Sequence, residues 1–235
     1  MKKFWNFLDN EGERTLRLDG AIAEETWWGD EVTPAAFREE LQAGSGDITV
    51  WINSPGGDVF ATAQIYTMLK EYSGKVTVKI DGLAASAASV VAMAGAEVMM
   101  SPVSYMVIHN PSTIAIGDSE EMLRAKEMLD EVKEGIINAY EDKSKLPRAE
   151  ISLLMNGESC FNAKKAVALG FADGILYREN QREDTSQPVL FSRTAVMNSL
   201  LDKLPAQKKP EPDKKTRESG TAFEILEARI NNLKD

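Results

Sequence analysis

The sequence predicts an α/β domain built on a mainly parallel β-sheet, and two observations carry this prediction. Two short apolar runs, at 48–52 and 75–80, are each followed by a glycine-containing turn and then by a segment with helical spacing. Because this strand–turn–helix order repeats, the connections are expected to be right-handed crossovers, which make the strands parallel. The chain has 235 residues, of which 43% are apolar, so it can bury one sizeable core.

The first elements follow from local periodicity. Residues 13–23 alternate enough between apolar and polar side chains to form a strand, and 33–43 form a helix with a proline in its first turn. Residues 48–52 form a buried strand. The helix at 58–72 has one apolar face, because its apolar side chains recur three or four positions apart, and Gly74 ends it.

The same order of elements follows immediately. Residues 75–80 are predicted to form a strand, 81–86 a turn, and 86–96 a helix made mostly of small residues. Residues 97–111 hold two more short strands, which Pro102 separates.

Helices dominate the next part of the chain. Residues 118–143 form a long helix, 147–156 a shorter one, and 162–176 a helix that ends at Gly170 before a closing strand. In the long helix the apolar residues lie three or four positions apart and form one stripe: Met122, Ala125, Leu129, Val132, Ile136 and Tyr140.

The composition changes near residue 180. Residues 205–220 are rich in proline, lysine and glutamate and contain nothing that could build a core. A short apolar stripe follows, formed by Phe223, Leu226, Ile230 and Leu233. We therefore predict an N-terminal segment (1–12), a core domain (13–180) and a flexible C-terminal extension (181–235) with a short amphipathic helix.

Charge and cysteine content limit the partners and the compartment. The net charge of −10 argues against nucleic acid and against an anionic membrane surface, since both bind basic faces. Cys160 is the single cysteine, so no internal disulfide is expected. We therefore expect a reducing, cytoplasmic compartment. The N-terminus is too polar for a signal peptide, and no apolar run is long enough to span a membrane. No cluster of cysteines and histidines predicts a metal site, and no nucleotide-binding motif predicts a cofactor.

Both glycine-containing turns are expected beyond the carboxyl ends of their strands, where open α/β sheets place their sites. Acyl transfer needs a nucleophile at such a turn and backbone N–H donors for the oxyanion. Ser86 falls at the start of a predicted helix, and the amides of Ala87 and Gly57 are candidate oxyanion donors. Ser89 lies one turn further, where serine tends to bond back to the helix backbone. Spacing alone favours tight packing as the reason for so many small residues, so the catalytic interpretation of Ser86 needs further support.

A base and an acid complete the candidate set. His109 is the only histidine, and its imidazole is the only side chain whose unperturbed pKa suits general-base work near neutrality. It follows an apolar strand, and it lies at the same sheet edge if that strand is parallel to the others. A lone histidine is nevertheless more often structural. Glu158, before a helix, and Asp173, after it, are candidates for the acid that orients the base; Asp173 is the alternative and could equally cap a turn.

Several segments resemble the proteolytic subunit of the Clp protease family. They are "WINSPGGDVFATAQIYTML" (51–69), "IDGLAASAASVVAMAG" (80–95) and "YMVIHNP" (105–111), in this order and spacing. "NAKKAVALGFADGIL" (162–176) is similar to the closing helix and strand of the family, so the likeness covers 15–178. The resemblance implies a ClpP/crotonase-like fold of repeated ββα units and a serine peptidase.

The resemblance also implies roles for individual residues. Ser86 is the expected nucleophile, His109 the base, and the amides of Gly57 and Ala87 the oxyanion donors. The third member in the family is an aspartate just before the closing helix, and the matching position here holds Glu158. A glutamate reaches one methylene further and can still accept the imidazole N–H. This departure is why Asp173, named above, stays in reserve.

Other departures indicate a subgroup. The loop at 112–122 differs from the housekeeping enzyme, 181–235 is additional, and 157–173 is similar to phage-encoded, Clp-like head maturation proteases. The resemblance then implies a homo-oligomeric ring that cuts capsid or scaffold proteins in a bacterial or phage-infected cytoplasm, with or without an ATPase unfoldase. The helix at 118–143 fits the "handle" through which such rings stack, although a plain core helix would carry the same stripe.

Three alternatives stay open at this point. A housekeeping Clp subunit would share the catalytic residues, and an inert ring-forming paralogue would share the fold. Crotonase-like acyl-CoA enzymes also use glycine-rich turns as an oxyanion hole, but they lack a serine and a histidine at these positions.

Overall fold

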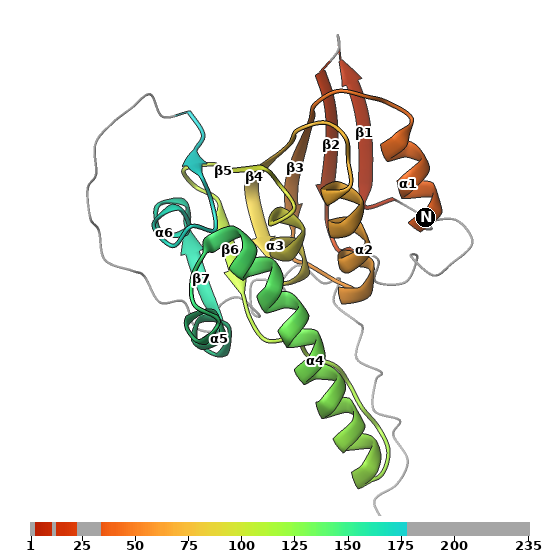
Figure 1. Cartoon of the computed structure of the whole chain (residues 1–235), viewed down its shortest axis with the longest axis vertical. Coiled ribbons are helices and arrows are strands. Elements are labelled where there is room, and N and C mark those ends of the chain that lie inside the picture. Colours follow the sequence, from red (N-terminus) through yellow and green to blue (C-terminus); the bar gives the residue numbers. More distant parts are fainter. Residues whose placement is uncertain (1–2, 11–12, 23–33, 178–235) are drawn as a thin grey trace, which may run out of the picture. The chain divides into compact units, whose positions relative to one another are not determined.

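The computed structural model describes residues 3–10, 13–22 and 34–177 (Figure 1). These residues form an eight-stranded sheet and six helices. The strands are β1 (Trp5–Asn10), β2 (Glu13–Asp19), β3 (Ile48–Ser54), β4 (Val76–Ala85), β5 (Glu97–Met100), β6 (Tyr105–Ile108), β7 (Ser159–Asn162) and β8 (Gly174–Ile175). The helices are α1 (Pro34–Gln42), α2 (Val59–Lys70), α3 (Ala87–Ala92), α4 (Ser119–Ser144), α5 (Arg148–Asn156) and α6 (Ala163–Ala168).

The sheet is mainly parallel, as predicted. Its order is β1-β2-β3-β4-β5-β8, and β6 pairs with both β4 and β7. The β2–β3, β3–β4, β4–β5, β4–β6 and β5–β8 pairs are parallel, whereas β1–β2 and β6–β7 are antiparallel. The mixed α/β fold class, consistent with the ClpP/crotonase-like expectation, is therefore confirmed.

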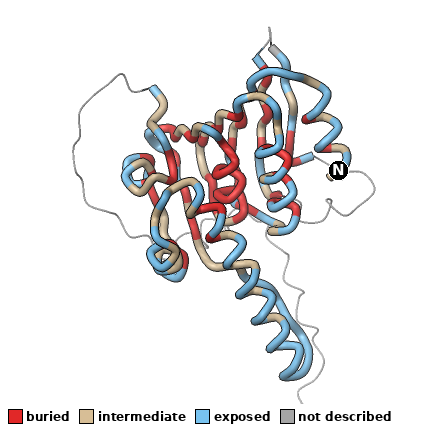
Figure 2. The backbone as a smooth tube through the Cα atoms, in the orientation of Figure 1, coloured by how far each residue is buried: buried red, intermediate tan, exposed pale blue. Residues whose placement is uncertain are grey.

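One face of the central strands supplies the core. Inward side chains alternate with partly exposed ones along β2, β3 and the first half of β4, as the period of a strand requires. The buried aliphatic side chains of these strands are Leu16, Leu18, Ile48, Val50, Ile52, Val76, Val78 and Ile80. Every residue of α3 is buried, and Figure 2 shows this short helix and the central strands as the most buried part of the described chain.

The structure corrects one predicted element and adds two. We predicted a turn at 81–86, but β4 continues to Ala85 because Leu83–Ala85 pair in parallel with Tyr105–Val107 of β6. A register shift between Ile52 and Ser54 of β3 accommodates this continuation. Strands β1 and β7 were not predicted: β1 lies in the segment 1–12, where it pairs with β2, and β7 lies directly before α6.

The long helix α4 is buried only near its C-terminal end, where Ile137, Ala139 and Tyr140 enter the core. Its first half lies beyond the sheet and is exposed (Figures 1 and 2). Large apolar side chains are exposed there and in the preceding loop: Ile114, Ile116, Met122, Leu123 and Met128. The first half of α4 is therefore not a plain core helix, which was one of the two explanations for its apolar stripe.

Two further observations concern the limits of the described chain. None of the helices among the described residues is long and apolar enough to cross a membrane. The predicted C-terminal extension, 181–235, and its short amphipathic helix lie outside the described residues. The predicted domain boundaries accordingly stay a prediction.

Candidate active site

Ser86 occupies the turn between β4 and α3. Its backbone has φ 54° and ψ −127°, a conformation that non-glycine residues rarely adopt. The Ser86 N–H donates to the carbonyl of Val107 in β6 at 2.9 Å. Although Ser86 is the N-cap residue of α3, its side chain makes no capping hydrogen bond. The turn thus presents a half-buried hydroxyl in a strained backbone, a feature that clusters at functional sites.

The Gly56–Gly57 turn packs directly against Ser86. A Cβ atom on Gly56 would lie 2.7 Å from the carbonyl oxygen of Ala85 and 2.8 Å from Cβ of Ser86. A Cβ atom on Gly57 would lie 2.1 Å from the carbonyl oxygen of Ile22. Neither position can hold a side chain without moving the backbone, so both glycines are needed for this close approach.

The direction of the Gly57 amide follows from its neighbours. The Ile22 N–H donates to the Gly56 carbonyl at 2.8 Å, and the Asp58 N–H donates to the Ile22 carbonyl at 2.9 Å. Successive amides of an extended chain point to opposite sides. The Gly57 N–H therefore points away from Ile22, toward the side on which Ser86 lies.

His109 comes to the same edge of the sheet as Ser86. Strand β6 is parallel to β4, with Ala85 opposite Val107, so the residues that follow the two strands are neighbours. We expected His109 at this edge only if its strand were parallel to the others, and β6 is parallel to β4. Ser86 and His109 line one hollow of about 250 Å³, which we call the Ser86 hollow.

The Ser86 hollow combines polar groups with an apolar wall. Gly57 and Ala87 also line it, so both residues predicted to supply oxyanion amides border the same space as Ser86 and His109. The wall opposite is apolar and comes from α3 and α4: Val90, Met128, Leu129, Val132 and Ile136. Such a site can hold an extended chain by an apolar side chain while the polar groups face its backbone carbonyl.

Glu158 is brought toward His109 by the β6–β7 pair. In this antiparallel pair Ile108 lies opposite Ser159, so the next residues outward are His109 and Glu158. Glu158 has φ 48°, and its N–H donates to the Met155 carbonyl at 3.1 Å, which closes the turn after α5. The register places the backbone of Glu158 beside that of His109.

Asp173 lies elsewhere. Its Oδ2 accepts the Val98 N–H at 2.6 Å and pairs with Nζ of Lys143 at 2.6 Å. Val98 lies opposite Val78, near the beginning of β4, whereas Ser86 follows the end of that strand. The eight residue steps from Val78 to Ser86 span at most roughly 25 Å at the rise of a β-strand. The structure therefore separates Asp173 from Ser86 and His109.

Two polar residues behind Ser86 form a contact that spacing did not fully predict. The Ser89 hydroxyl donates to the Ser86 carbonyl at 2.5 Å, as expected for a serine one turn into a helix. The same hydroxyl lies 2.7 Å from the hydroxyl of Tyr140. The sequence places Tyr140 only in an apolar stripe, since periodicity carries no information about its hydroxyl.

The described residues give no support to metal or thiol chemistry. Within 3–10, 13–22 and 34–177, no group of three or more His, Cys, Asp or Glu side chains could hold a metal ion. Cys160 is half-buried on β7, and burial raises the pKa of its thiol. A raised pKa disfavours the reactive thiolate.

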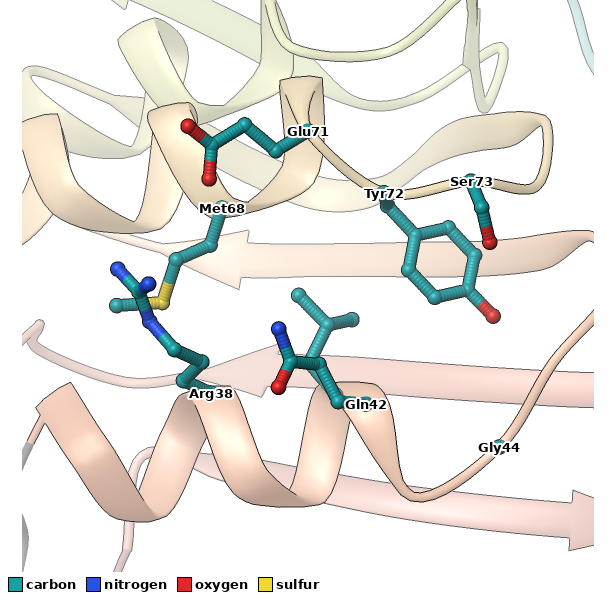
Figure 3. A pocket seen from close by; sticks show the side chains of 8 residues that line it. Arg38, Gln42, Gly44, Met68, Glu71, Tyr72 and Ser73 are labelled. Carbon is teal, nitrogen blue, oxygen red and sulfur yellow. The ribbon is translucent and has the colours of Figure 1, made fainter.

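A second hollow, of about 240 Å³, lies between α1 and α2 (Figure 3). Arg38 and Gln42 reach it from α1, and Met68 and Glu71 reach it from the end of α2. None of the predicted catalytic residues lines this space, so the Ser86 hollow is the stronger candidate for an active site.

Comparisons with known proteins identify the family of the chain. The chain is 32% identical over 146 residues to the ATP-dependent Clp protease proteolytic subunit 1 of Chlamydia muridarum, covering 60% of this chain and 76% of that protein. It is 29% identical over 150 residues to the ATP-dependent Clp protease proteolytic subunit of Leuconostoc citreum, covering 62% and 75%. The family model described as Clp protease matches residues 13–179, a range that includes every predicted site residue. The chain belongs to the Clp protease family.

Proposed function

We propose that this chain is a serine endopeptidase subunit in which Ser86 is the nucleophile and His109 the base. The observation that carries the proposal is that Ser86, His109, Gly57 and Ala87 all line one hollow. Membership of the Clp protease family supports peptide bonds as the substrate.

The proposed reaction has two stages. His109 takes the proton of Ser86 as Oγ attacks the carbonyl carbon of the substrate, and the Gly57 and Ala87 amides stabilise the resulting oxyanion. The intermediate collapses as His109 gives the proton to the leaving amine, which leaves an acyl ester on Ser86. Water, deprotonated by His109, then attacks the ester, and return of the proton to Ser86 Oγ releases the new carboxylic acid.

Glu158 is the proposed orienting acid. The β6–β7 register supports this role, because it continues from Ile108 and Ser159 to His109 and Glu158. A carboxylate there can accept the second imidazole N–H and hold the ring in the tautomer that a base requires. Asp173 is less suited, because Lys143 and the backbone of Val98 occupy its Oδ2 at the other end of β4.

We further propose that the chain acts as a homo-oligomeric ring. Its exposed apolar side chains support this: Ile114 is 92% exposed and Ile116 is 89% exposed, and Leu123 of α4 is 55% exposed. Large apolar side chains exposed in this number are typical of sites of protein association. In this proposal the first half of α4 is the handle that contacts a second copy of the chain.

For the biological role we propose head maturation, the cutting of capsid or scaffold proteins in a phage or prophage. The loop at 112–122, the similarity carried by 157–173 and the additional residues 181–235 support it. A housekeeping Clp subunit is the second candidate, and the names of the relatives, which are ATP-dependent Clp subunits, favour it.

Replacing the nucleophile should abolish the chemistry and spare the fold. We expect Ser86→Ala to eliminate both peptide cleavage and labelling by a fluorophosphonate probe, with an unchanged native mass. Ser112→Ala, a hydroxyl that lines the same hollow, is the control and should label within about twofold of the wild-type rate. Labelling that persists in Ser86→Ala would overturn the assignment, and a wild-type chain that never labels would favour the inert paralogue.

Isosteric amides distinguish the two candidate acids. Glu158→Gln should lower kcat by about 10²-fold to 10⁴-fold, because the amide cannot hold the imidazole in the required tautomer. Asp173→Asn should lower the melting temperature, since it weakens the pair with Lys143, but should keep kcat within about threefold. Steady-state kinetics and thermal unfolding of both variants provide the measurement. The opposite pattern, a large loss of kcat only in Asp173→Asn, would make Asp173 the acid.

The handle proposal concerns assembly. We expect Leu123→Glu to reduce the native mass to smaller species, because it buries a charge in an apolar contact between copies. Arg124→Gln, at the next position of the same exposed helix, should leave the native mass unchanged. Native mass spectrometry gives both results, and a wild-type chain that is monomeric at micromolar concentration would contradict the proposal.

The two biological roles differ in their need for an ATPase. A maturation protease should cut a capsid or scaffold protein of the same genome into discrete products without ATP, and Ser86→Ala should not. Digestion that requires a Clp ATPase and ATP, with no cut in their absence, would favour the housekeeping role. Gel electrophoresis and intact-mass analysis of the products report the result.

A further inference from the structure

A pair of buried hydroxyl groups lies directly behind the nucleophile turn. Ser89 is 0% exposed and Tyr140 is 1% exposed, and their hydroxyl oxygens are 2.7 Å apart. Ser89 comes from α3 and Tyr140 from the buried end of α4, so the pair joins two helices that border the Ser86 hollow.

The direction of the two hydrogen bonds is determined by chemistry. The Ser86 carbonyl oxygen can only accept, so the Ser89 hydroxyl donates its single hydrogen to it across 2.5 Å. The Tyr140 hydroxyl must then be the donor to Ser89 Oγ. Burial raises the pKa of Tyr140, which keeps this phenol protonated as a donor should be. The result is a chain of hydrogen bonds from Tyr140 through Ser89 to the Ser86 carbonyl.

This series of hydrogen bonds acts on the peptide unit that contains a proposed oxyanion donor. The Ser86 carbonyl and the Ala87 N–H belong to one planar, trans peptide, so they point in opposite directions. A carbonyl held back toward Ser89, which also donates its N–H to it at 3.0 Å, aims the Ala87 N–H the other way, toward the Ser86 hollow.

We propose that Ser89 and Tyr140 are positioning residues that hold the Ser86–Ala87 peptide with its N–H directed at the oxyanion. The inference rests on the proposed function, in which Ala87 supplies one of the two oxyanion amides. Hydrogen bonds in series polarise one another, so an accepting carbonyl also makes the N–H of the same peptide a better donor.

The peptide needs such restraint because Ser86 is strained. Its φ of 54° is unfavourable for a residue with a side chain, and rotation of the following peptide would be one route to relief. Tyr140 is well placed to resist this movement. Its ring packs edge-on against Phe171 with centroids 5.5 Å apart, so its hydroxyl has a fixed position.

Removal of either hydroxyl should affect kcat rather than KM, since the oxyanion exists only during the reaction. We expect Ser89→Ala to lower kcat for p-nitrophenyl acetate about 10-fold to 100-fold, less than the loss of a whole oxyanion donor, with KM within about twofold. Tyr140→Phe keeps the ring on Phe171 and leaves Ser89 as a donor, so a loss of about 3-fold to 10-fold is expected. The double variant should resemble Ser89→Ala, because both hydroxyls act through one carbonyl.

Ser104→Ala is the matched control. The Ser104 hydroxyl is also 0% exposed and also donates to a carbonyl three residues earlier, that of Ser101, at 2.9 Å. It precedes β6, at the opposite end of that strand from His109. Its loss should lower the melting temperature and leave kcat within about twofold.

The outcomes separate this inference from the proposed function. If a fluorophosphonate does not label the wild-type chain, both the proposed function and this inference are contradicted. A wild-type chain that labels, with unchanged kcat in folded Ser89→Ala or Tyr140→Phe, overturns the inference alone. Equal losses of kcat in Ser104→Ala and Ser89→Ala would also overturn it, because the effect would then be one of general stability. If Ser89→Ala does not fold, the nearly isosteric Tyr140→Phe decides by the same kcat and KM criteria.

Discussion

The parallel pairing of β4 with β6 is the constraint on which the candidate site depends. Ala85 lies opposite Val107, and the Ser86 N–H donates to the Val107 carbonyl, so β6 determines where β4 ends and where Ser86 turns. The same pair sets the position of His109, which is the second residue after Val107. Backbone hydrogen bonds thereby bring Ser86 and His109, from separate segments of the chain, to one edge of the sheet. This placement does not require a contact between their side chains.

That pairing explains the run of small residues around Ser86. The second half of β4 must accept β6 on one side while the Gly56–Gly57 turn approaches so closely that a Cβ on Gly56 would overlap Ser86 and Ala85. Alanine and glycine are the residues small enough for such crowding. The positive φ of Ser86 belongs to the same geometry, since the chain must leave the strand and start α3 within one residue.

Much of this arrangement could be predicted from the sequence, and the misses have physical causes. Strands β2 to β6 carry apolar runs or alternation, and the helices carry helical spacing, that the sequence shows clearly. The extension of β4 over 81–85 was missed because glycine and alanine have low strand propensity, and only the tertiary contact with β6 makes them a strand. Strand β7 was missed because its four residues begin and end with polar side chains and lack the apolar run that marks the equally short β5 and β6. Asp173 and Glu158 flank one helix in the sequence. Only the pairing register of the strands shows that they lie at opposite ends of the sheet, and the sequence does not give that register.

The apolar stripe of α4 shows why periodicity predicts a face without predicting what covers it. A stripe means only that apolar side chains share one side of a helix, whether that side meets the core or another molecule. In this chain the stripe has two environments: Val132 and Ile136 form part of the wall of the Ser86 hollow, whereas Met122 is exposed. Tyr140 stands at the inner end, where its ring is core and its hydroxyl bonds to Ser89. One helix thus lines the Ser86 hollow near one end and exposes apolar side chains at the other, and burial, not pattern, separates the two parts.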